Sequence, residues 1–125
     1  LTDTNNLFGG LEFSEKLAGL GIQPIAGLQL AVQFEDADPA RPVPPAPGVV
    51  LLAQTEEGYR NLMRLASRAY FDVGLGEAPR VAAHRLIESG AGLVALTGGS
   101  AGPLDAALRG GGRLDLAEAR LDLLL

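Results

Sequence analysis

Residues 1–6, Leu-Thr-Asp-Thr-Asn-Asn, have the pattern of a buried strand that runs straight into a helix cap. Asn5 and Asn6 are the capping candidates, because short polar side chains accept hydrogen bonds from the first free amides of a helix. In parallel α/β proteins the carboxyl ends of strands carry the acidic residues that meet a ligand or a metal. Asp3 is therefore the strongest candidate for chemistry. Because the stretch starts inside an element and without Met, we expect the chain to be a fragment that lacks an earlier strand.

The composition fits one domain, or a piece of a larger one. The chain has 125 residues, of which 47% are hydrophobic and only 5% aromatic, so its core must be built from Leu, Ala and Val. A net charge of −5 gives no overall attraction for nucleic-acid phosphates. The lack of Cys excludes disulfides, a zinc ribbon and a thiol nucleophile, and it suits a cytoplasmic protein. No apolar run is long enough to predict a membrane span.

Helical and extended stretches alternate along the first half of the chain. Apolar spacing predicts a helix over about 7–20, ended by Gly21, and an extended stretch over 22–34. The apolar stripe of this helix comprises Leu7, Phe8, Leu11, Leu17 and Leu20. Residues 35–48 hold five of the eight prolines and have no periodicity, which predicts a surface loop. The apolar run over 49–53 is short enough for a strand buried on both faces.

Thr55 opens the clearest helix of the chain. Its hydroxyl is a good cap, and Glu56 and Glu57 suit the positive end of the helix dipole. Glu56 is also spaced to pair with Arg60 one turn later. The predicted apolar stripe consists of Tyr59, Leu62, Met63, Ala66 and Ala69. A second face carries Arg60, Arg64 and Arg68, which we interpret as a solvated face, with contact to DNA phosphates as the alternative.

The second half of the chain continues the alternation. A short helix near 82–89 is stopped by Gly90, a buried strand covers 93–96, and Pro103 suits the first position of the next helix. The last helix begins near residue 114 and is expected to turn to solvent the acidic residues Asp115, Glu118 and Asp122. Strands that alternate with helices favour an α/β fold with a parallel sheet.

Two other features bear on chemistry. His84 is the single His, so a histidine-rich metal cluster cannot be assembled from this chain. A Ser-His-Asp triad would have to use His84, and no nucleophile elbow accompanies it. We interpret it as an exposed or capping residue. The loop at 97–102, Thr-Gly-Gly-Ser-Ala-Gly, joins a strand to a helix, and its amides could cradle a phosphate. It matches neither the P-loop nor the dinucleotide fingerprint, so a plain glycine turn is the favoured interpretation.

Several stretches, taken in order, resemble one known family. They are Leu-Thr-Asp-Thr-Asn-Asn-Leu-Phe-Gly at 1–9 with Leu-Glu-Phe at 11–13, Gly-Ile-Gln-Pro-Ile-Ala-Gly-Leu-Gln at 21–29, Val-Leu-Leu-Ala-Gln at 50–54 with Glu-Gly-Tyr-Arg-Asn-Leu at 57–62, and Pro-Arg at 79–80 with Gly-Leu-Val-Ala-Leu-Thr-Gly at 92–98. Together they look like the polymerase-and-histidinol-phosphatase (PHP) domain at the N-terminus of bacterial DNA polymerase III alpha subunits, most of all the alphaproteobacterial type. The proline-rich loop is the variable part.

The resemblance implies an α/β fold that is part of a distorted (β/α)7 TIM-like barrel, with a metal pocket at the carboxyl ends of its strands. In metal-binding relatives the first strand carries a His-x-His pair, which would lie before Leu1. The other pocket positions fall on Asp3, Thr4, Gln29, Gly48 and Gly99. Asp3 keeps the family's acid, whereas the other four replace a His, a Glu, a His and a Cys in that order. Thr, Gln and Gly cannot replace such ligands, so we expect a degenerate pocket with no metal and no catalytic residue.

The same resemblance implies that residues 1–125 are part of the PHP domain of a DNA-directed DNA polymerase that replicates the chromosome, with the polymerase domains outside this chain. It implies no cofactor in this stretch and Mg²⁺ for the full-length polymerase. The implied role is structural. The domain would contact the rest of the alpha subunit and dock the proofreading exonuclease (epsilon) subunit. DNA and other replicase subunits would be reached only through the full-length protein, and no membrane is involved.

Two alternatives remain open at this point. One is a fragment of a stand-alone PHP-type metal-dependent phosphoesterase, which would need histidines upstream of Leu1. The other is a non-catalytic α/β binding module that holds an anion in the loop 97–102. In each case a partial barrel leaves sheet edges unpaired and apolar faces uncovered, so we expect the isolated chain either to self-associate or to be unstable.

Overall fold

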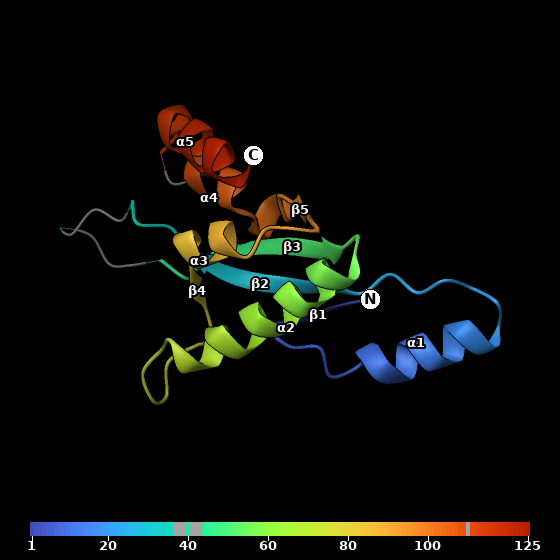
Figure 1. Ribbon diagram of the computed structural model, residues 1–125. Helices are drawn as coiled ribbons and strands as arrows, with labels where there is room; N and C mark the ends of the chain where they lie inside the picture. The colour runs from blue at the N-terminus through green and yellow to red at the C-terminus, as the bar shows by residue number, and fades with distance from the viewer. Residues whose placement is uncertain (37–39, 41–43, 110) are drawn as a thin grey trace.

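The computed structural model describes residues 1–36, 40, 44–109 and 111–125. Figure 1 shows a central sheet with helix α2 (Glu56–Phe71) lying along it, while helix α1 (Gly10–Gly19) stands apart. The strands are β1 (Thr2–Thr4), β2 (Gly27–Gln33), β3 (Gly48–Ala53), β4 (Val81–Ala82) and β5 (Leu93–Leu96). The shorter helices are α3 (Ala83–Glu88), the 3-10 turn η1 (Gly99–Ala101), α4 (Pro103–Arg109) and α5 (Leu114–Leu124). The α/β class is confirmed.

The sheet is mixed and not parallel. The strands run in the order β1-β2-β3-β5, and β4 pairs with the last two residues of β2. β1 and β4 are parallel to β2, whereas β3 is antiparallel to both β2 and β5. The prediction of a parallel sheet is therefore wrong for β3. A parallel neighbour needs a crossover, usually a helix, and the described residues between β2 and β3 contain none.

The hydrophobic core lies between one face of the sheet and the helices that cover it. Alternate residues of β2 and β3 are buried there: Leu28, Leu30, Val32, Val49 and Leu51. They pack with residues from α2, β4 and α3, chiefly Leu62, Leu65, Ala69, Val81 and Leu86. The predicted short strands at 49–53 and 93–96 and the helix near 82–89 are all present. Strand β4 was not predicted, because two residues carry no usable period.

Helix α2 begins as predicted, but its buried face is rotated from the predicted stripe. The Thr55 hydroxyl accepts from the Gly58 amide at 3.0 Å, which confirms the cap. Its buried residues are Gly58, Asn61, Leu62, Leu65 and Ala69, whereas Tyr59 and Met63 are 40% and 42% exposed. The reason is a close backbone contact: a Cβ on Gly58 would collide with the carbonyl oxygen of Gly92. This contact sets the face of the helix that meets the sheet.

Helix α1 does not use its predicted apolar stripe as a packing face. None of its residues is buried, and Phe8 just before it is 87% exposed. Leu7 alone among the stripe residues packs against the core. The helix begins at Gly10 and not at the predicted caps Asn5 and Asn6, because the intervening residues form a turn.

One partly buried ion pair joins the C-terminal helices to the segment after β2. Arg120 of α5 donates to both carboxylate oxygens of Asp36, at 2.6 and 3.0 Å, and to the Pro103 carbonyl oxygen at 2.9 Å. Its guanidinium lies 4.9 Å from the centre of the Phe34 ring. This clamp holds α4 and α5 against the sheet, and it was not predicted from the sequence.

The proline-rich loop predicted over 35–48 is only partly described. Residues 37–39 and 41–43 lie outside the described residues, and Gly48 already belongs to β3. Pro44 to Pro47 have no regular secondary structure, which agrees with the prediction for that part.

Candidate functional site

Three of the five predicted pocket positions come together on the face of the sheet opposite the core. The β1–β2 register places Thr4 beside Gln29. Gly48 of β3 lies across from Ala31 of β2. The Gln29 side chain extends over Gly48, since a Cβ on Gly48 would lie 2.9 Å from Gln29 Nε2. A side chain as large as His at Gly48 would need the space that the Gln29 amide fills.

These positions border a cavity of about 450 Å³, which we call the sheet cavity. It is lined by Thr4, Gln29, Ala31, Pro44, Pro45, Ala46, Pro47, Gly48, Ala101, Ala106 and Arg109. This set contains no carboxylate and no imidazole, and its single charged side chain is the guanidinium of Arg109. A divalent cation needs anionic or imidazole ligands, so the residues present here do not fit the metal that the resemblance implies.

Asp3 faces away from the sheet cavity. Side chains alternate along a strand, and Asp3 pairs with the fully buried Leu28, whereas Thr4 pairs with Gln29 on the other face. The Asp3 Oδ2 atom accepts a hydrogen bond from the Gly9 amide at 2.9 Å. A Cβ on Gly9 would lie 3.0 Å from that oxygen, so a side chain there would crowd the contact. Asp3 thus fastens the turn that leads into α1.

Asn5 extends the pairing of β1 with β2 instead of capping a helix. It adopts a left-handed backbone conformation with φ of 56°. Its amide donates to the Gln29 carbonyl oxygen at 2.7 Å, and its Oδ1 accepts from the Ala31 amide at 2.9 Å. The side chain of Asn6 closes the same turn by accepting from the Phe8 amide. These contacts fix the backbone beside the sheet cavity.

The loop 97–102 uses its glycines for close backbone approach. Gly98 has φ of 74°, and a Cβ on it would collide with the Gly48 carbonyl oxygen. A Cβ on Gly102 would collide with the Thr97 carbonyl oxygen. These contacts support the interpretation of a glycine turn. Gly99, the fifth pocket position, does not line the sheet cavity, although Ala101 of the same turn does.

The remaining candidates do not gather into a site. Among the described residues, no group of three or more His, Cys, Asp or Glu side chains is placed to hold a metal ion. His84 is exposed, with its Nδ1 3.0 Å from Glu35 Oε1. The predicted acidic side of α5 is exposed, as expected. There the hydrogen bonds from Arg113 lower the pKa of Asp115 below its ordinary value.

The arginine stripe of α2 is engaged along the helix itself. Arg60 pairs with Glu56, Arg64 donates to the Asn61 Oδ1 atom at 3.0 Å, and Arg68 pairs with Asp72 at 3.3 Å. The Glu56 partner of Arg60 was predicted. This arrangement supports the solvated face over a DNA contact.

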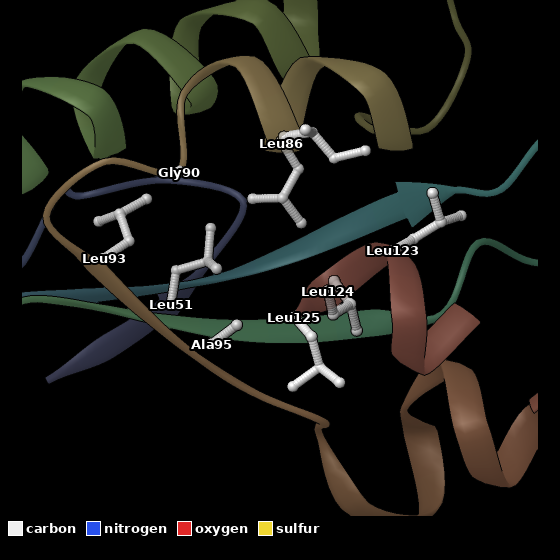
Figure 2. Close-up of a pocket in the computed structure, with 9 residues that line it drawn as sticks. Leu51, Leu86, Gly90, Leu93, Ala95, Leu123, Leu124 and Leu125 are labelled. Carbon is white, nitrogen blue, oxygen red and sulfur yellow. The ribbon is translucent and has the colours of Figure 1, made fainter. Parts of the chain in front are cut away.

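A second cavity, of about 270 Å³, lies between α3, β3, β5 and the last turn of α5 (Figure 2). Figure 2 shows that its labelled lining residues are Leu, Ala and Gly, among them Leu51, Leu86 and Leu124. No side chain here offers a polar group that would orient a ligand. The cavity therefore carries no site chemistry.

Comparison with known proteins identifies the family of this chain. The chain matches the PHP domain over residues 1–125 and belongs to that family. It is 37% identical over 123 residues to the DNA polymerase III subunit alpha of Caulobacter vibrioides, covering 98% of this chain and 11% of that protein. It is 40% identical over 126 residues to the subunit of the same name from Thermus aquaticus, covering 98% of the chain and 10% of the relative.

An error-prone DNA polymerase of Mycobacterium tuberculosis strain H37Rv is 35% identical over 124 residues, which cover 98% of the chain and 11% of that protein. The chain thus spans about a tenth of the length of these relatives. The predicted resemblance to the alpha-subunit PHP domain, with an alphaproteobacterial relative among the matches, is confirmed. No helix in the described part of the chain is both long enough and apolar enough to cross a membrane.

Proposed function

We propose that this chain is part of the PHP domain of a replicative DNA polymerase, the alpha subunit of DNA polymerase III. Three features support the proposal: the match along the whole chain, the two alpha-subunit relatives and the small share of each relative that the chain covers. The complete protein would be a DNA-directed DNA polymerase whose Mg²⁺-dependent nucleotidyl transfer is carried out by domains outside this chain. The described strands would form one arc of a distorted (β/α)7 barrel, with the sheet cavity on its inner face.

We further propose that the domain is a metal-free scaffold. The observation that carries this proposal is the lining of the sheet cavity, where Thr4, Gln29 and Gly48 converge beside Arg109. Neutral hydroxyl and amide groups are poor ligands for a cluster of cations, and the guanidinium charge repels them. Asp3 cannot make up the deficit, because its carboxylate faces the other side of the sheet and accepts from Gly9.

Isothermal calorimetry with Mn²⁺ and Zn²⁺ tests the metal-free proposal. We expect no saturable binding above that of the Asp3→Ala variant. Tight binding that Asp3→Ala abolishes would contradict the proposal. Hydrolysis of a chromogenic phosphate ester is assayed on the same samples in the presence of metal. Metal-dependent turnover would favour a phosphoesterase instead.

The scaffold would serve two neighbours, the rest of the alpha subunit and the proofreading exonuclease (epsilon) subunit. Other replicase subunits and DNA would be reached through the full-length protein. Hydrogen exchange of the full polypeptide with and without the exonuclease subunit tests the docking role. We expect slower exchange in peptides from residues 1–125 when the subunit is added. Unchanged exchange throughout this range, with complex formation verified by gel filtration, would contradict it.

A further inference from the structure

We propose that the sheet cavity binds a small oxyanion, with Arg109 as its cationic partner and Thr4 and Gln29 as hydrogen-bond donors. The inference rests on the proposed absence of metal from this pocket and goes beyond it. A pocket that has lost its metal ligands need only be inert. The side chains that remain here have a chemistry of their own.

The donors of the sheet cavity are uncommitted. Within the described part of the chain, neither the Thr4 hydroxyl nor the Gln29 amide takes part in a hydrogen bond. Arg109 makes one weak bond, from Nε to the Asp105 carbonyl oxygen at 3.4 Å. Both terminal nitrogens of its guanidinium therefore remain available. Hydroxyl, amide and guanidinium groups that share one cavity are the groups with which proteins contact phosphate oxygens.

The charge of the sheet cavity has the sign that an anion needs. The chain as a whole carries −5, yet no carboxylate lines this cavity and its one charge is positive. Elsewhere in the described structure Arg60 and Arg68 pair with Glu56 and Asp72, and Arg64 donates to the neutral Asn61 side chain. Arg120 is held by Asp36. Arg109 forms no ion pair with any described residue. An oxyanion would supply the missing acceptor through charge-assisted hydrogen bonds.

The shape of the cavity suits a small ligand. Its volume of about 450 Å³ lies in the range of small-molecule sites. The walls are fixed on one side by the β1–β2–β3 pairing and on the other by the close contact of Gly98 with the Gly48 carbonyl oxygen. This site differs from the anion site considered for the glycine loop, because its donors come from the sheet and from α4.

Binding of inorganic phosphate to the full polypeptide tests the inference, with hydrogen exchange of peptides covering 44–48 and 99–109 as a local readout. We expect phosphate to slow exchange in both peptides in a saturable manner. Arg109→Gln keeps a polar, uncharged side chain and removes the guanidinium, so the apparent Kd should rise at least about tenfold. Arg60→Gln removes an arginine that is distant from the cavity lining and should leave the Kd unchanged. Gln29→Glu keeps Arg109 but adds a carboxylate, and it should abolish the protection.

Acetate in place of phosphate distinguishes a phosphate site from a general carboxylate site, since either anion supports the inference when Arg109→Gln weakens it. Saturable protection that is equal in wild type and Arg109→Gln, or no protection at all, would overturn it. The same samples titrated with Mn²⁺ separate the two proposals. If neither phosphate nor Mn²⁺ binds, the oxyanion site alone is refuted. If Mn²⁺ binds and phosphate does not, the metal-free scaffold is refuted as well.

Discussion

The clamp formed by Arg120 offers the sharpest test of how this fold is held together. Arg120→Met keeps much of the side-chain volume over Phe34 but removes every donor that reaches Asp36 and the Pro103 carbonyl oxygen. The Arg120 and Asp36 side chains are only 11% and 25% exposed, so the carboxylate left behind cannot be fully rehydrated in the folded state. Removing one partner of a buried pair costs about 3–5 kcal/mol. Because a quarter of Asp36 reaches water, we take the lower end, about 3 kcal/mol.

Hydrogen exchange of α4 and α5 in the full polypeptide measures this cost directly. A loss of about 3 kcal/mol in local opening corresponds to roughly a hundredfold faster exchange. Arg60→Met is the matched control, because it breaks an ion pair in which both side chains are well exposed. Such a pair is worth about 0–1 kcal/mol, so exchange in α2 should accelerate less than about fivefold.

A double-mutant cycle isolates the pair from the other contacts of Arg120. Asp36→Asn combined with Arg120→Met should cost less than the sum of the single changes, since the second substitution removes a group that is already unpaired. The reasoning is refuted if Arg120→Met accelerates exchange in α4 and α5 no more than Arg60→Met does in α2. It is also refuted if the single effects add without coupling.

Three further predictions test the backbone packing, the surface electrostatics and the sheet edges. Gly58→Ala should destabilise the fold by about 3 kcal/mol or more, because the added Cβ collides with the Gly92 carbonyl oxygen. Gly10→Ala places its Cβ in open space and should stabilise the fold by up to about 1 kcal/mol. Equal denaturation midpoints of the two variants would contradict this. Arg113→Gln should raise the pKa of Asp115 toward its ordinary 3.8 in a carboxyl-carbon NMR titration. Because the pKa of Asp115 is lower in the folded state, the pair stabilises the fold above pH 3.8, and this contribution is lost as the pH falls through the folded-state pKa. An Asp115 pKa that is the same in the variant as in the wild type would refute the contact. In the described structure β1 and β5 each pair with a single strand, so the isolated chain should self-associate or unfold, and a monodisperse monomer with a cooperative melt would show otherwise.

Local signals predicted the elements well where neighbours in sequence make the contacts. The Thr55 cap, the Glu56–Arg60 pair and the short apolar strands all depend on residues within a few positions of one another. The predicted parallel direction of β3 was wrong, because the alternation of strands and helices was assumed to continue between β2 and β3. The described residues of that connection contain no helix. The prediction of the buried face of α2 was wrong for another reason. The contact between Gly58 and Gly92 that sets this face comes from a turn that is distant in sequence.

The candidate site divides in the same way. Thr4, Gln29 and Gly48 were selected from the sequence, and strand register brings them together. Arg109 was missed, because nothing in the short helix α4 indicates that it reaches the same cavity. Arg120 did leave a signal: it falls on the helical face of Ala117 and Leu124, where a charge without a buried partner would be costly.

The sequence by itself determined the family, the order of most elements and the neutral residue types at Thr4, Gln29 and Gly48, because these depend on residue identity and local spacing. Only the tertiary structure decided where the charges go. It turned Asp3 to the far side of the sheet, placed Arg109 among the residues that line the cavity and joined Arg120 to Asp36 across 84 positions of sequence. The physical reason is that a strand's two faces and a helix's orientation are fixed by packing partners distant in sequence, and electrostatics follows those positions.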